Sequence, residues 1–326
     1  MIERHISVWE GRRHKWRAGA GALVRLVLAE ARLLRPVRTS FDAVVVGYPG
    51  QLDVVPARRV ARGRPVLFNP LVTLTDTLVE DRGRFGPGSL AGRALRAVDR
   101  RALRGADLVV ADTRQNANYL SELADLPPER VAVCFVGAEE QIFTPRWSPS
   151  EPFTALFYGK LIPLHGVETV LEAARLEPGL RFRVIGSGQL EHVLDGRPPN
   201  VEWVRWVNYE WLPDELQDAG CALGIFGTTA KAQRVIPNKA FQALACGVPL
   251  VTADTPAARE LLSDGTSAVL VPPGNGEALA KAIRRLADDA AFAERIAHGG
   301  RAAYERQASE DVLGRRWRKL IESLTR

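Results

Sequence analysis

The feature that most constrains the fold is an alternation of short apolar runs with helical segments, which occurs twice along the chain. In the first half, Ser89–Arg104 and Arg114–Leu123 have apolar residues at helical spacing. The apolar runs around them are typical of buried parallel strands, and these expected strands are Asp42–Gly47, Pro65–Phe68, Asp107–Val110 and Arg130–Phe135. Strands that alternate with helices predict a parallel sheet with helices on both faces.

A segment with several prolines separates the two series. Gly137–Pro152 contains Pro145, Pro149 and Pro152 and lacks a clear period, so we interpret it as an interdomain linker. The strands expected after it are Phe153–Phe157, Arg181–Ile185, Val201–Val204, Ala222–Phe226, Pro249–Thr252 and Ala268–Val271. The helices expected there are Val167–Leu176, Leu212–Ala219, Asn238–Ala245, Ala257–Leu262, Gly276–Ala287 and one from Ala291 onward. The pattern predicts two Rossmann-like domains with a ligand cleft beyond the carboxyl ends of their strands.

Composition excludes several classes of protein. Hydrophobic residues make up 46% of the 326 residues and charged residues 25%, which is typical of a globular protein rather than a disordered or disulfide-rich one. Cys134, Cys221 and Cys246 lie far apart and fit no metal-binding spacing, so we expect buried thiols in a reducing compartment. No run approaches the roughly 20 apolar residues of a membrane helix. We therefore expect a cytoplasmic protein.

Basic residues are concentrated near the start of the chain. Residues 1–40 contain many more Arg and Lys than Glu residues, and a second basic group lies within residues 93–104. These groups could bind anionic lipid or nucleic acid, but solvated helix faces explain them more simply. The sequence shows no zinc finger or other nucleic-acid motif. We therefore expect no nucleic-acid partner and leave a peripheral contact with an anionic membrane open.

The most informative stretch is Ile236–Thr252, which has the sequence IPNKAFQALACGVPLVT. Pro237 favours the first turn of a helix, so Asn238 and Lys239 lie where free backbone amides and the helix dipole attract a phosphate. Lys239 adds a full positive charge, and Gln242 lies one turn further on the same face. The stretch therefore predicts an anion site at the start of a helix.

Two further loops follow expected strands. In Phe157–Gly166, Gly159 allows close approach of a ligand to the backbone, Lys160 and His165 supply positive charge, and Gly166 opens a helix. In the loop after Arg181–Ile185, Gly186 and Gly188 give only part of a dinucleotide fingerprint, because Glu191 replaces the third glycine. Two helix N-termini with nearby cations could bind one diphosphate.

Taken together, these stretches resemble the donor half of family 4 glycosyltransferases, which are GT-B enzymes that use nucleotide sugars. The resemblance covers Gly159–Gly166, Gly186–Gly188, Asn238–Thr252 and Ala258–Leu286, and it depends on the order and spacing of these four motifs. It is dense from about residue 153 to 287 and diffuse before that. It implies a GT-B fold with an N-terminal acceptor-side domain in residues 1–145 and a donor domain in residues 146–290.

The resemblance also assigns roles residue by residue. Lys160 takes the place of the arginine that binds the donor diphosphate, and His165 takes the place of a lysine. Gln242 replaces the second glutamate of the E-x7-E motif, which holds the ribose. Arg234 stands where the first glutamate contacts the donor sugar, and Glu260 could supply a carboxylate nearby or be a solvated helix residue. The expected donor-binding residues are Gly159, Gly166, Gly186, Arg234, Asn238, Gln242 and Glu260, with Lys160, Lys239 and His165 as catalytic residues.

The N-terminal half matches the family more loosely. The family often has a histidine in the loop after the second expected strand, whereas this chain has Asn69 and Asp76 there. Either could contact an acceptor or a sugar hydroxyl, or simply cap a helix. Tyr48, in the loop after the first expected strand, could line the acceptor side or belong to a turn. We name Asn69, Asp76 and Tyr48 as acceptor-side candidates.

The two ends carry separate expectations. Met1–Val8 resembles the second strand of the family, so about one β–α unit is expected to be missing at the start of the acceptor domain. Residues 291–326 are expected to be helical, and in GT-B proteins the last helix commonly packs back on the first domain. Trp317, Leu320 and Leu324 have the spacing of one buried face.

The function we predict is transfer of a sugar from a nucleotide diphosphate sugar to an acceptor hydroxyl, in polysaccharide or glycoconjugate synthesis. The resemblance implies a retaining reaction with no cofactor besides the donor, and no Asp-x-Asp pair or histidine cluster indicates a metal. A sugar or a lipid-linked acceptor would suit a protein at the inner face of a membrane. The alternatives are a non-catalytic nucleotide-sugar-binding relative and a nucleotide-sugar epimerase of the same fold.

Overall fold

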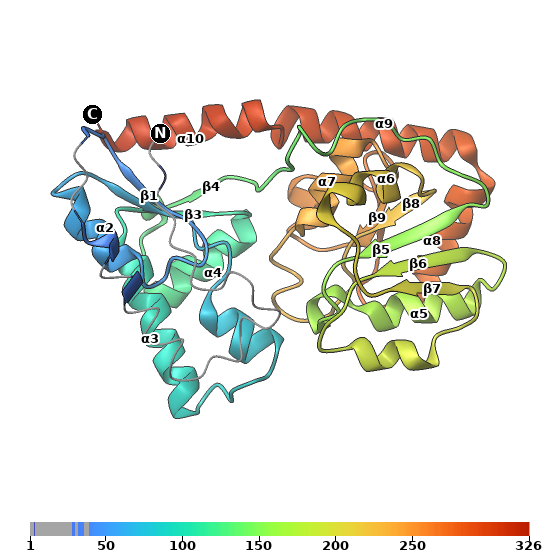
Figure 1. The fold of residues 1–326 in the computed structure, drawn as a ribbon, viewed down its shortest axis with the longest axis horizontal. Helices are drawn as coiled ribbons and strands as arrows, with labels where there is room; N and C mark the ends of the chain where they lie inside the picture. The colour runs from blue at the N-terminus through green and yellow to red at the C-terminus, as the bar shows by residue number, and fades with distance from the viewer. Residues whose placement is uncertain (1–2, 4–27, 30–31, 36–38, 326) are drawn as a thin grey trace.

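A computed structural model describes residue 3 and residues 28–29, 32–35 and 39–325 of the chain. These residues form two α/β domains, and a long helix near the C-terminus lies along the edge of the first domain (Figure 1). The expected strand at Met1–Val8 and most of the first basic group lie outside the described residues. None of the described helices has the length and apolar content needed to cross a bilayer.

The first domain has a four-stranded parallel sheet in the order β1-β2-β3-β4. Its strands are β1 (Val44–Val46), β2 (Val66–Phe68), β3 (Leu108–Ala111) and β4 (Val131–Val133). Its helices are α2 (Val54–Ala61), a short π-helical turn (Asp76–Asp81), α3 (Leu90–Gly105) and α4 (Arg114–Ala124). Ser89 and Thr113 cap α3 and α4 by accepting hydrogen bonds from Gly92 N and Asn116 N. The two caps fix where these helices begin.

The second domain has a six-stranded parallel sheet in the order β10-β9-β8-β5-β6-β7. Its strands are β5 (Thr154–Tyr158), β6 (Arg181–Ile185), β7 (Val201–Val204), β8 (Cys221–Leu223), β9 (Leu250–Ala253) and β10 (Val269–Val271). Its helices are α5 (Val167–Leu176), α6 (Leu212–Gln217), α7 (Asn238–Cys246), α8 (Gly276–Asp288) and α9 (Ala290–Gln307). Separate apolar cores fill the two faces of this sheet, as helices on both sides require. The expectation of two Rossmann-like domains is confirmed.

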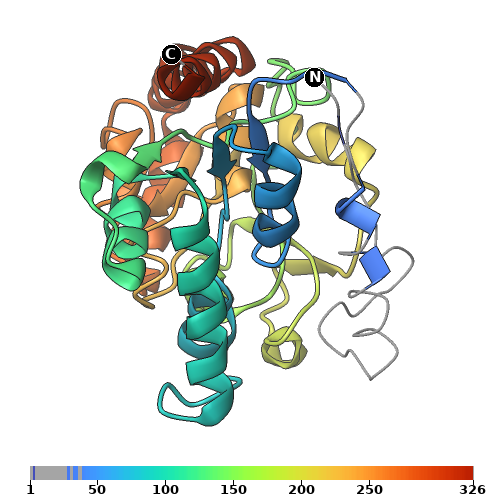
Figure 2. The ribbon, with the colours of Figure 1, turned by 90° about the vertical axis from the view of Figure 1, so that its left-hand side faces the viewer.

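The connection between the domains contains no helix or strand from residue 134 to residue 153. The chain also connects the domains a second time, through α9 and α10 (Glu310–Thr325). Trp317, Leu320 and Leu324 on α10 pack against Leu67 and Val110 of the first sheet. Figures 1 and 2 show α10 beside the first domain, although α9 covers the second.

Some predicted elements differ from the observed ones. The helix predicted at Ala257–Leu262 is wrong, because only a single 3-10 turn forms at Ala258–Glu260. Strand β8 ends three residues earlier than predicted, since Phe226 N donates a hydrogen bond to His165 O instead of continuing the ladder. Within the second basic group, Arg100 and Arg104 pair with Asp125 on the surface. This part of the group behaves as a solvated helix face.

Candidate functional site

Beside Gly159, in the loop after β5, lie the side chains of His165 from the same loop and Lys239 from α7. The backbone of Gly159 has φ +134°, and a Cβ atom there would lie 3.1 Å from His165 Cε1 and 3.6 Å from Lys239 Cε. A residue with a side chain would therefore crowd both groups as well as strain the backbone. Glycine at this position lets His165 and Lys239 approach the carboxyl end of the sheet.

Lys239 lies in the first turn of α7 and is 5% exposed. Its Nζ atom lies 3.7 Å from the centroid of the Phe157 ring and has no hydrogen-bond partner among the described residues. Burial lowers the pKa of this lysine well below its usual value, because a low-dielectric environment disfavours the ammonium form. The ring offsets only part of that cost. A bound anion would supply the missing partner.

His165 ends a 3-10 turn that leads into α5. Its Nδ1 atom is buried and has no hydrogen-bond partner among the residues described. Burial lowers the pKa of His165 well below its usual value, and the charges of Lys239 and Lys160 lower it further, against a hydrogen bond with the Lys160 backbone. We therefore expect a neutral imidazole at pH 7. Lys160 itself is exposed at the edge of the loop.

Close backbone packing fixes the shape of this region. A Cβ atom on Gly186, which has φ +145°, would lie 1.9 Å from Gly159 O, and one on Gly166 would lie 2.6 Å from Gly227 N. The loops after β5, β6 and β8 are thus in direct contact at the carboxyl end of the sheet. Gly159, Gly166 and Gly186, which were predicted as donor-binding residues, allow this close packing.

Asn238 and Gln242 occupy different environments on α7. Asn238 is exposed at the first residue of the helix, whereas Gln242 is buried. Gln242 Oε1 accepts a hydrogen bond from the Tyr158 hydroxyl at 3.0 Å, and its Nε2 atom donates to the Tyr209 hydroxyl at 3.3 Å. Both ends of the Gln242 amide are therefore engaged by tyrosines.

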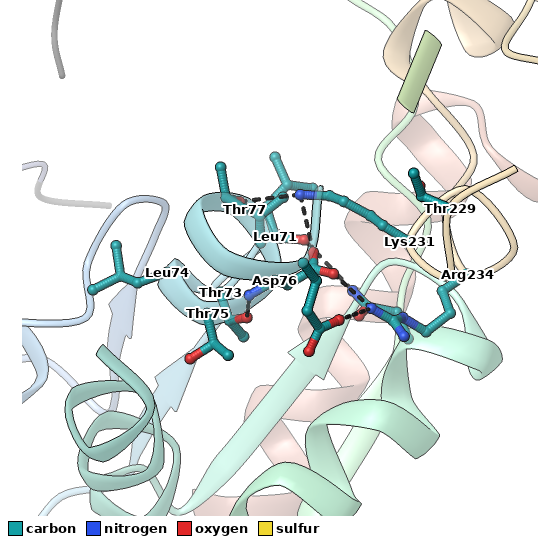
Figure 3. Close-up of polar contacts among 12 residues, drawn as sticks. Leu71, Thr73, Leu74, Thr75, Asp76, Thr77, Thr229, Lys231 and Arg234 are labelled. Atoms are coloured by element: carbon teal, nitrogen blue, oxygen red, sulfur yellow. Dashed lines mark hydrogen bonds and ion pairs between the residues drawn. The ribbon is translucent and has the colours of Figure 1, made fainter. Parts of the chain in front are cut away.

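A buried ion-pair cluster joins the two domains (Figure 3). Asp76 Oδ2 lies 2.9 Å from Lys231 Nζ, and Asp76 Oδ1 lies 2.5 Å from Arg234 Nη2. Lys231 Nζ also donates to Thr77 Oγ1 at 3.0 Å. Asp76 and Lys231 are almost fully buried, so the charge of each offsets the free-energy cost of burying the other. Lys231 was not predicted from the sequence, where its only signal is a single cation in a loop of small residues after β8.

Two more predicted donor residues also contact the first domain. Arg234 pairs with Glu80 at 3.1 Å, and its guanidinium carbon lies 3.9 Å from the centroid of the Tyr119 ring. Glu260 accepts hydrogen bonds from Arg114 N at 2.7 Å and Gln115 N. It thus caps the start of α4, where backbone amides favour a carboxylate. Arg234 and Glu260 thus form contacts between the two domains.

The acceptor-side candidates are spread over the first domain. Asn69 Nδ2 donates to Val110 O at 2.8 Å and ties the loop after β2 to β3. Tyr48 is half exposed in the loop after β1. Asp76 belongs to the ion-pair cluster described above. A hollow of about 560 Å³ lies elsewhere, beside Cys246 at the opposite end of α7, and contains none of the candidate residues.

Comparisons with known proteins agree with this architecture. A family model described as "Glycosyl transferases group 1" matches residues 152–289, and one described as "Glycosyl transferase 4-like domain" matches residues 3–137. The chain belongs to the group 1 glycosyltransferases. It has their GT-B fold, with two parallel-sheet domains that face one another. The predicted resemblance to family 4 glycosyltransferases is therefore confirmed.

The individual relatives of this chain are distant. A D-inositol 3-phosphate glycosyltransferase of Thermomonospora curvata is 28% identical over 230 residues, which are 60% of this chain and 52% of the relative. The chain spans about half the length of the first curated relatives it matches. Sucrose-phosphate synthase from Thermosynechococcus elongatus has a TM-score of 0.73 at 17% identity, covering 93% of this chain and 79% of its own.

Another solved structure shares the fold of this chain. Anabaena HepE in complex with UDP and glucose has a TM-score of 0.70 at 17% identity, covering 94% of this chain and 84% of its own. Identity this low shows the fold alone. The roles of individual side chains in this chain therefore have to be argued from their own contacts.

Proposed function

We propose that this chain transfers a sugar from a nucleotide diphosphate sugar to an acceptor hydroxyl. The observation that carries the proposal is the pair of buried groups at the carboxyl end of β5, Lys239 Nζ and His165 Nδ1, both without a hydrogen-bond partner in the described part of the chain. Buried polar groups are normally hydrogen-bonded, so two such groups in contact with one glycine loop support a ligand site. Membership of the glycosyltransferase family supports a donor diphosphate as that ligand.

The proposed chemistry is electrostatic. Breaking the glycosidic bond leaves growing negative charge on the diphosphate, and Lys239, Lys160 and the N-termini of α5 and α7 stabilise it. His165 is neutral and can contribute a hydrogen bond. Diphosphate charge raises the pKa of Lys239 toward its usual value, so donor binding takes up a proton whenever the free lysine is deprotonated. Donor affinity should then fall as the pH rises.

Stereochemistry, metal dependence and acceptor are further parts of the proposal. Family membership supports retention of configuration, and the cationic residues can take over the charge stabilisation that a metal ion provides in other transferases. The contacts between the domains can exclude water during transfer. We propose a sugar or lipid-linked acceptor on the side of Tyr48, Asn69 and Asp76, and a cytoplasmic location with a peripheral membrane contact.

The test is transfer activity over a panel of UDP-, GDP- and dTDP-sugars with hydroxyl acceptors, with products identified by NMR. Lys239→Ala and Lys160→Ala should each lower transfer at least about tenfold, because one lost electrostatic contact costs roughly 3–4 kcal/mol of barrier. Lys281→Ala is the matched control, since Lys281 is exposed on α8, where its ammonium group pairs with the exposed Glu277. Melting temperatures show whether each variant folds.

The outcomes distinguish the proposal from its alternatives. Full transfer activity in either lysine variant would contradict the assigned roles. Nucleotide binding without transfer over the whole panel would favour a non-catalytic relative. Consumption of the donor without an acceptor would favour an epimerase.

A further inference from the structure

One carboxylate of the π-helical turn has an oxygen atom without a hydrogen-bond partner among the described residues. Asp81, at the end of the π-helical turn, is 5% exposed, and its Oδ1 atom has no hydrogen-bond partner among the described residues. An acceptor oxygen that is removed from water without a partner costs free energy. Asp76 in the same turn differs, because both of its oxygens are paired with cations. Asp81 is thus the carboxylate of this turn that can accept another hydrogen bond.

The position of Asp81 places it next to the proposed donor site. The backbone amide of Leu164, which directly precedes His165, lies close enough to the Asp81 carboxylate to lower its pKa, although burial raises that pKa overall. The charge of Lys231 acts on both Asp81 and His165. Asp81 therefore reaches from the first domain to the same loop that presents His165 beside Lys239.

The unsatisfied atoms of Lys239 and Asp81 have complementary chemistry. Lys239 Nζ lacks an acceptor, whereas Asp81 Oδ1 lacks a donor. A nucleotide sugar offers both kinds of group, because its diphosphate carries acceptor oxygens and its sugar carries hydroxyl donors. A bare nucleoside diphosphate keeps the diphosphate oxygens but lacks the hydroxyls of the transferred sugar.

We propose that Asp81 binds a hydroxyl group of the transferred sugar, and so contributes to donor specificity from the acceptor-side domain. The inference rests on the proposed function and adds one subsite to it. Because Oδ1 is shielded from solvent, the sugar must enter before the domains close around Leu164. A site that hydrogen-bonds a substrate hydroxyl discriminates strongly against an analogue without it.

The experiment compares nucleotides with their sugars by calorimetry: UDP with UDP-glucose, GDP with GDP-mannose, and dTDP with dTDP-glucose. The pair that binds wild-type protein best is then measured with Asp81→Asn, which keeps the shape of the side chain. We expect the nucleotide-sugar dissociation constant to rise about tenfold or more, as for loss of a hydrogen bond to a charged group. The nucleotide dissociation constant should stay within about twofold.

The controls separate a binding role from a structural one. Glu80→Gln changes a neighbouring carboxylate that pairs with Arg234, and it should leave the preference for sugar over nucleotide unchanged. If Asp81→Asn displaced the loop that contains Leu164, His165 would move as well, and the affinity for the bare nucleotide would also fall. If Asp81→Asn does not fold, Asp81→Ser gives the same readout, since its hydroxyl can also accept a hydrogen bond.

Two results would overturn the inference while leaving the proposed function in place. One is equal weakening of nucleotide and nucleotide sugar, which would make Asp81 a structural contact. The other is unchanged affinity for both. Failure of the wild-type protein to bind any nucleotide of the panel would overturn the proposed function and this inference together.

Discussion

Lys239 shows what single residues contribute to the proposed site. Its side-chain nitrogen lies over the Phe157 ring and has no hydrogen-bond acceptor among the described residues. The sequence predicted Lys239 near a helix start because Pro237 favours that position, and α7 does begin at Asn238. The contact with Phe157 could not be predicted, because it joins residues 82 positions apart through the fold.

Asp112 gives a prediction about pH at the same scale. Burial raises the pKa of Asp112 to about 6 from 3.8, against hydrogen bonds from Asn116 and nearby backbone amides. A raised acid pKa stabilises the fold fully below about pH 4 and loses that contribution as the pH rises through about 6. The loss amounts to about 3 kcal/mol at most. Asp112→Asn, whose side chain does not ionise, should remove this loss of stability with rising pH.

The measurement is the free energy of unfolding from urea titrations at pH 4 and pH 7. Asp112→Asn should gain stability relative to wild type between these two pH values. Asp195→Asn, at an exposed position, is the control and should show a smaller change. A constant difference between Asp112→Asn and wild type at both pH values would contradict the assigned cause.

At the scale of elements, hydrophobic pattern predicted most of the strands and helices. Strand β6 was predicted with its observed bounds, and β7 likewise, because a buried parallel strand is apolar and short. The Ala258–Glu260 turn was predicted too long, since Glu260 reaches across to α4 and Arg259 pairs with Asp254. The spacing of hydrophobic residues gives no information about such tertiary contacts.

Helix α10 supplies the prediction at this scale. Trp317 packs with Leu313 and Leu320 against the first sheet, and Arg316 Nε donates to Val133 O at 2.5 Å. Trp317→Ala should lower the free energy of unfolding by about 2 kcal/mol, less than for a fully buried tryptophan. Urea titration measures this. Arg318→Ala, at an exposed neighbour, should have little effect, and an equal loss in both variants would refute the packing role.

At the scale of the whole molecule, one cluster of contacts between the domains joins the loop after β8 to the π-helical turn. Sequence could place these two loops at a common cleft, because both follow the carboxyl ends of parallel strands. It could not show that Asp76 pairs with Lys231 and Arg234, since those residues are more than 150 positions away. We therefore attribute domain closure to side chains that only the structure brings together.

Removing Asp76 should loosen this closure. Asp76→Ala leaves two cations in the cleft without their carboxylate, and breaking a buried pair in this way costs about 3–5 kcal/mol. We expect a larger radius of gyration by small-angle X-ray scattering together with a lower melting temperature. Asp125→Ala, which removes an exposed carboxylate paired with Arg100 and Arg104, should change neither strongly. A closed Asp76→Ala protein of wild-type stability would disprove the role of this cluster.

The most direct measurement is a crystal structure of the chain with UDP or GDP, whichever raises its melting temperature more. The account predicts diphosphate oxygens within hydrogen-bond distance of Lys239 Nζ, beside His165 and the start of α5. A nucleotide bound outside this loop, with Lys239 still resting on Phe157, would contradict it.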